Sequence, residues 1–138
     1  MQSMRNGMNE KKRILIVEDD PGIAHLLEYI LLDEEFEVST TNNANDALQY
    51  VNECKGSYDL IITCICLPGE MNGLEMSSII KQRYSKIPII VCVGLTHYYI
   101  EALKSGIVDK VIQKPFLLKD LIKAVQKLTT DLTTSPIQ

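Results

Sequence analysis

Short strand-like segments alternate with amphipathic stretches along this chain, and the alternation limits the folds that it can adopt. Five segments rich in β-branched and other apolar residues cover 14–17, 36–40, 58–65, 87–93 and 111–113. The stretches that follow them, with apolar residues at helical spacing, cover about 21–31, 44–54, 74–84, 98–105 and 118–128. Apolar runs without alternation are typical of strands buried on both faces. The pattern therefore predicts five strands that alternate with five helices.

Strands and helices that alternate in this way form a parallel sheet with helices on both faces. Because crossovers between parallel strands are right-handed, we expect a doubly wound, three-layer α/β/α sandwich. In such folds the ligand site lies beyond the carboxyl ends of the strands, at the switch point. This edge is predicted to gather the residues at four strand ends, which are Glu18 with Asp19, Cys64, Val93 and Lys114.

Length and composition indicate one domain with flexible ends. Of the 138 residues, 1–11 predict a flexible leader, 12–128 the folded domain and 129–138 a flexible tail. The net charge is −4 without a basic stripe, so nucleic-acid binding by this domain is not expected. No apolar run is long enough to span a bilayer, and no secretory signal is present. These features predict a cytoplasmic protein without membrane contact, in which the four cysteines are free thiols.

Several motifs in this order resemble the receiver domain of bacterial two-component response regulators. They are ILIVEDD at 14–20, DLIITCICLPG at 59–69, NGLE at 72–75, IPII at 87–90 and KPF at 114–116. The resemblance covers about residues 12–128. It implies a flavodoxin-like (βα)5 fold with strand order 2-1-3-4-5, and a signalling module that is not an enzyme.

Part of the family's phosphorylation site is retained. Glu18 and Asp19 match the acidic residues that help to hold Mg²⁺, since hard cations favour carboxylate oxygens. Lys114 matches the lysine that contacts the phosphoryl group, and it precedes a proline that forms a cis peptide in this family. A lysine here would also neutralise the clustered carboxylates when no phosphate is bound.

The other parts of that site are replaced. The phosphate-accepting aspartate falls on Cys64, and the hydroxyl residue at the end of the fourth strand falls on Val93. The aromatic switch residue of the fifth strand falls on Val111, or on Lys110 if the count after Gly106 is shifted by one. Valine has no hydrogen-bonding group. Together these replacements predict a pseudo-receiver, released from the phosphorylation cycle.

Cys64 allows more than one interpretation. Phosphocysteine is disfavoured, because Glu18 and Asp19 would raise the pKa of the thiol above its ordinary value. A small apolar core residue is the simplest interpretation. Two functional alternatives remain: redox sensing with Cys66 close by, and a soft-metal site formed by Cys64, Cys66, Asp19 and Glu18.

The sequence thus predicts a single-domain receiver of a two-component phosphorelay that signals by protein contact without phosphorylation. Its partner would be a histidine kinase or a downstream signalling protein. No cofactor is required, and Mg²⁺ at Glu18 and Asp19 is left open. The alternatives are a receiver phosphorylated on Asp19 or Asp20 and a thiol redox or metal sensor through Cys64. The segment from Val93 to Gly106 is shorter than is usual in the family, which predicts a stunted or rotated fourth helix.

Overall fold

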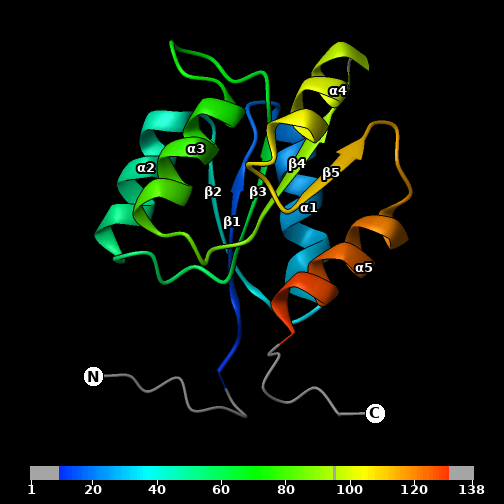
Figure 1. The fold of residues 1–138 in the computed structure, drawn as a ribbon. Coiled ribbons are helices and arrows are strands. Elements are labelled where there is room, and N and C mark those ends of the chain that lie inside the picture. Colours follow the sequence, from blue (N-terminus) through cyan, green and yellow to red (C-terminus); the bar gives the residue numbers. More distant parts are fainter. Residues whose placement is uncertain (1–9, 95, 131–138) are drawn as a thin grey trace, which may run out of the picture.

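A computed structural model describes residues 10–94 and 96–130 of the chain, and within them five parallel strands form one sheet between two layers of helices (Figure 1). The strands are β1 (Arg13–Val17), β2 (Glu37–Thr41), β3 (Leu60–Cys64), β4 (Ile89–Val93) and β5 (Lys110–Gln113). The helices are α1 (Pro21–Asp33), α2 (Ala44–Glu53), α3 (Gly73–Arg83), α4 (Thr96–Ser105) and α5 (Leu118–Thr129). The strand order is β2-β1-β3-β4-β5. The predicted fold class and strand order are confirmed.

Each face of the sheet has its own apolar core, because successive side chains of a strand point to opposite faces. The odd-numbered strand residues, such as Leu15 and Ile61, pack against α2, α3 and α4. The even-numbered ones, such as Ile16 and Ile62, pack against α1 and α5. Figure 1 shows α2 and α3 on one side of the sheet and α1 and α5 on the other. All five residues of β3 and of β4 are buried, as expected for apolar runs without alternation.

Side-chain caps fix the helices that begin at the carboxyl edge of the sheet. Asp20 accepts hydrogen bonds from the backbone N–H groups of Gly22 (2.8 Å) and Ile23 (3.2 Å), so that α1 begins at Pro21. Asn72 and Glu75 form a capping box at the start of α3. These caps hold the loops after β1 and before α3 in place around the strand ends.

Gly73, the first residue of α3, lies directly against the end of β3. A Cβ atom at this position would lie 1.9 Å from the carbonyl oxygen of Cys64. Only glycine lets the helix approach that closely. The backbone of Gly73 also donates a hydrogen bond to the carbonyl oxygen of Ile65 at 2.8 Å. The loop between β3 and α3 is therefore folded back onto the residue that the resemblance aligned with the phosphate acceptor.

Many element boundaries differ from the predicted ones by one or two residues. Strand β3 ends at Cys64, one residue before the predicted end. Helix α4 begins at Thr96, two residues earlier than predicted, and has ten residues. The stunting or rotation of this helix relative to other receivers stays a prediction. Helix α5 extends to Thr129, whose hydroxyl group donates to the carbonyl oxygen of Val125 at 2.8 Å.

Most of the predicted leader and tail lie outside the described residues. Within the described ranges, no helix combines the length and the apolar character needed to cross a membrane.

Candidate functional site

The ends of β1, β3 and β4 and the loop after β5 surround a cavity of about 370 Å³ at the carboxyl edge of the sheet. Five of the predicted site residues line it: Glu18, Asp19, Cys64, Val93 and Lys114. The structure therefore brings together the residues that the strand-end rule grouped. The roles that the resemblance gives them remain predictions.

Glu18 is the buried acid of this site, with 6% of its surface exposed. Its Oε2 atom accepts a hydrogen bond from the backbone N–H of Asp20 at 3.0 Å, and its Oε1 atom lies 3.7 Å from the Nζ atom of Lys114. Burial raises the pKa of Glu18, while the Asp20 N–H group and the Lys114 charge act in the opposite direction. Lys114 thus compensates a carboxylate that is costly to bury. The Lys114–Pro115 peptide bond is cis, as the resemblance implied.

The Cys64 side chain faces this acidic group. Its Sγ atom lies 3.9 Å from Oδ1 of Asp19 and 3.6 Å from the carbonyl oxygen of Cys66. Burial, followed by the charge of Glu18, raises the pKa of Cys64 to about 12. The thiol is therefore protonated at neutral pH, and a protonated thiol is a weak nucleophile.

Cys66 does not lie beside Cys64 as a second strand residue would. Because β3 ends at Cys64, the alternation of a strand no longer applies to Cys66, whose side chain is exposed. The backbone carbonyl of Cys66, not its thiol, faces the Sγ atom of Cys64. This arrangement does not support a direct redox pair between these two cysteines.

The cavity is also lined by residues that sequence reasoning did not place there, and two of them carry polar or reactive groups. Cys92 is the Cα partner of Cys64 in the parallel register of β3 and β4, and burial raises the pKa of its thiol to about 12. Tyr98, in the first turns of α4, brings an aromatic ring to the same cavity. No local pattern in the sequence indicates that Cys92 faces Cys64, because this pairing depends on the register between β3 and β4.

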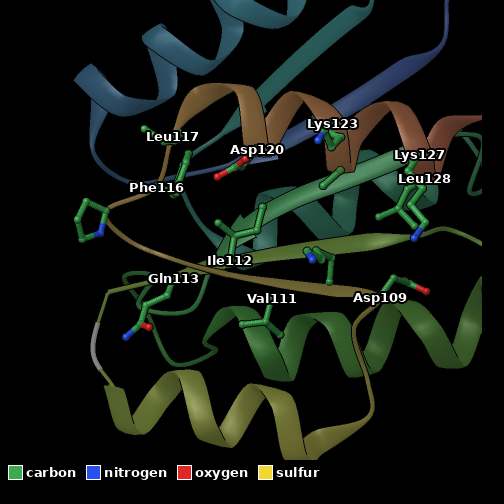
Figure 2. A pocket seen from close by; sticks show the side chains of 13 residues that line it. Asp109, Val111, Ile112, Gln113, Phe116, Leu117, Asp120, Lys123, Lys127 and Leu128 are labelled. Carbon is green, nitrogen blue, oxygen red and sulfur yellow. The ribbon is translucent and has the colours of Figure 1, made fainter.

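Val93 and Val111 take different places. Val93 is buried in the core on the α2, α3 and α4 face, and its carbonyl oxygen accepts from the backbone N–H of Lys114 at 2.6 Å. Val111 pairs with Val91 and does not line the cavity at the strand ends. It lines a groove of about 700 Å³ between β5 and α5, where its side chain and that of Ile112 point to opposite sides of β5 (Figure 2).

A family model described as response regulator receiver domain matches residues 14–126. The chain belongs to the response-regulator receiver family. Receivers are signalling modules of two-component systems and are generally not catalytic. The matched range includes the site residues described above, from Glu18 to Lys114.

Curated relatives are similar over about half of their own length. The receiver is 32% identical over 118 residues to the DNA-binding response regulator MtrA of Mycolicibacterium smegmatis, covering 84% of this chain and 50% of that protein. It is 35% identical over 118 residues to the response regulator ArlR of Staphylococcus aureus, with 84% and 52% covered. The likeness therefore concerns the receiver portion of these relatives.

Solved structures show the same fold. Response regulator protein TrrA from Thermotoga maritima, in complex with Mg²⁺-BeF, is 36% identical with a TM-score of 0.76, covering 85% of this chain and 98% of that one. A signal receiver domain of a histidine kinase from Syntrophus aciditrophicus is 27% identical with a TM-score of 0.80, covering 92% and 96%.

Receivers bind Mg²⁺ in their phosphorylation site. The side chains at the carboxyl edge of this sheet can be compared with the ligands that Mg²⁺ needs. Mg²⁺ requires oxygen ligands at about 2.0–2.1 Å in near-octahedral geometry. The Sγ atom of Cys64 lies beside the carboxylates of Glu18 and Asp19 in this site, and sulfur is a poor ligand for Mg²⁺. The residues present do not fit a Mg²⁺ site.

Proposed function

We propose that this receiver transmits two-component signals by protein contact and does not accept a phosphoryl group. The central observation is the Cys64 side chain, a buried neutral thiol that faces Asp19 at the carboxyl edge of the sheet. Phosphorylation of a receiver begins with an anionic oxygen nucleophile that shares a metal ion with the phosphoryl donor. The neutral thiol of Cys64 provides neither the anionic oxygen nucleophile nor an oxygen ligand for Mg²⁺.

The thiol of Cys64 is a poor substitute for that nucleophile. With a pKa of about 12, only on the order of one thiol in 10⁵ is ionised at pH 7. Val93 adds a second obstacle, because its methyl groups cannot donate a hydrogen bond to a phosphoryl oxygen. Lys114 is retained, but its ammonium group already faces Glu18. The retained lysine is therefore explained by charge compensation alone.

The groove between β5 and α5 is the surface that we propose for the protein partner. Phe116, Leu117 and Leu128 give it an apolar part, and Lys123 and Lys127 lie along α5 at its rim (Figure 2). Leu117 is 59% exposed, so its apolar side chain is accessible to a partner at this groove. Val111 lies in this groove, at the position that the resemblance aligned with the aromatic switch residue of the family. Its side chain has no ring that could move between two positions. One constitutive shape is expected, without a population shift on phosphorylation.

Intact-mass measurement after incubation with acetyl phosphate and Mg²⁺ tests the proposal. We expect the mass of the receiver to be unchanged, whereas a canonical receiver treated in parallel gains one phosphoryl group. A gain in mass would overturn the proposal, and peptide mapping would then decide between Cys64 and the alternative acceptors Asp19 and Asp20. Asp20 is already the N-cap of α1, so its carboxylate is committed to two backbone N–H groups.

A further inference from the structure

We infer that the exchange of carboxylate for thiol at Cys64 turns the magnesium edge of a receiver into a site for a thiophilic divalent cation such as Zn²⁺. The proposed ligands are the Sγ atom of Cys64, carboxylate oxygens of Glu18 and Asp19, and the carbonyl oxygen of Cys66. This inference goes beyond signalling by contact and does not depend on it, since a receiver could bind the metal whether or not it accepts phosphate.

The donor atoms are spaced for zinc. One ligand atom each from Glu18, Asp19 and Cys64 lie within 4.8 Å of one another. In a tetrahedral site with Zn–S of about 2.3 Å and Zn–O of about 2.0–2.2 Å, a sulfur and an oxygen ligand are roughly 3.6 Å apart. The Sγ atom of Cys64 lies 3.6 Å from the Cys66 carbonyl oxygen and 3.9 Å from Oδ1 of Asp19. In an octahedral Mg²⁺ site, neighbouring oxygens are only roughly 2.9 Å apart.

The donor types select the same class of metal. Thiolate ligands favour Zn²⁺ and other soft or borderline ions, whereas Mg²⁺ favours oxygen ligands alone. Binding replaces the proton on Cys64 by the metal, so that one S–H bond is lost, one S–Zn bond forms and H⁺ is released to water. The two carboxylates and the thiolate then contribute three negative charges, and Lys114 contributes one positive charge. Zn²⁺ neutralises the net charge of −2 that results.

The surroundings provide access and support. Asp19 is exposed while Glu18 and Cys64 are buried, so that a metal ion can enter from the solvent side. The adjoining cavity of about 370 Å³ leaves room for a water molecule at an open coordination position. The Asp20 N–H group fixes the Glu18 carboxylate from behind at 3.0 Å, as outer partners of metal ligands commonly do.

Cobalt titration followed by absorption spectroscopy tests the inference, because Co²⁺ takes zinc sites and reports on its ligands. We expect tetrahedral d–d bands, a thiolate-to-metal charge-transfer band in the near ultraviolet, and loss of both on addition of Zn²⁺ but not of Mg²⁺. Calorimetry should give a Zn²⁺ affinity at least about 100-fold above that for Mg²⁺.

Cysteine variants locate the sulfur ligand. Cys64→Ser should lose the charge-transfer band and weaken Zn²⁺ binding on the order of 100-fold. Cys54→Ser, at the end of α2, is the matched control and should leave the spectrum unchanged. Cys66→Ser should also leave it unchanged, because the ligand there is the backbone carbonyl.

Three results would overturn the inference: a wild-type protein without the charge-transfer band, a band that survives Cys64→Ser, or a band that is lost in Cys66→Ser. Asp19→Asn keeps the test decisive if Cys64→Ser does not fold, because Asp19 is exposed. This variant should keep the charge-transfer band and weaken Zn²⁺ binding. Full-strength binding in Asp19→Asn would exclude the proposed ligand set.

Discussion

The Sγ atom of Cys64 lies 3.9 Å from Oδ1 of Asp19, so that a neutral thiol meets an acidic side chain at the carboxyl edge of the sheet. The contact joins the end of β3 to the loop after β1, and both elements are held by caps and by the close approach of Gly73. The backbone around this contact is thus fixed on both sides, by the cap of α1 and by the packing of α3 against β3.

Restoring the missing oxygens should restore phosphorylation. We expect Cys64→Asp combined with Val93→Thr to gain one phosphoryl group from acetyl phosphate in the presence of Mg²⁺. The new carboxylate lies beside Glu18 and Asp19, so the metal-free variant should be about 1–3 kcal/mol less stable than the parent, and Mg²⁺ should recover the loss. Intact mass and urea unfolding measure both effects. Val93→Thr alone is the control and should stay unmodified. A folded double variant that remains unmodified would show that the edge is blocked by more than these two side chains.

Alkylation rates should separate the cysteines. Cys66 is exposed and should react with iodoacetamide first. Cys64 and Cys92 are buried, and each has its pKa raised to about 12, so their rates should still be increasing at pH 10. Peptide mapping after timed alkylation at pH 7–10 measures this order. Rapid reaction of Cys64 well below pH 8.5 would instead favour the thiol-sensor alternative.

The pH dependence of stability should contain a contribution from Glu18. Burial raises the pKa of Glu18 above its ordinary value of 4.5, so between 4.5 and the raised value the folded state binds more protons than the unfolded state. The contribution of this group to stability is therefore fully present below pH 4.5 and is lost as the pH rises through the folded pKa. We expect Glu18→Gln to remove this loss, so that the variant gains stability relative to the parent between pH 4 and pH 7. Urea unfolding across that range checks the sign; a relative loss with rising pH would contradict it.

Gly73→Ala should damage the site through the backbone. Its Cβ atom would lie 1.9 Å from the carbonyl oxygen of Cys64, which cannot move without displacing β3 or α3. We expect a loss of about 3 kcal/mol or more in the free energy of unfolding. Gly94→Ala is the matched control at the end of β4, where the new methyl group would meet no atom within 4 Å. Equal stability of the two variants would show that the loop yields easily to the methyl group.

Much of the fold could be predicted because its signals are local. The β-branched runs around Ile16, Ile62 and Ile90 follow from the tendency of such residues to fill strands buried on both faces. Asp20 is the N-cap of α1 and Pro21 is its first residue, and both residue types are local signals for the start of a helix. The boundary of β3 was missed by one residue, because Ile65 is as apolar as the strand itself and is buried in the loop. Apolar character alone does not reveal where pairing stops.

The amino-acid sequence by itself determined the alternation of strands and helices and, through the rule for parallel sheets, the grouping of Glu18, Asp19, Cys64, Val93 and Lys114 at one edge. Only the tertiary structure decided that Cys92 is the neighbour of Cys64, and that Cys66 offers its carbonyl oxygen instead of its thiol. Strand register and the folding back of a loop depend on contacts between residues far apart in the chain. The same holds for the raised pKa values of Glu18 and Cys64, since burial is a property of the packed molecule and not of any local pattern.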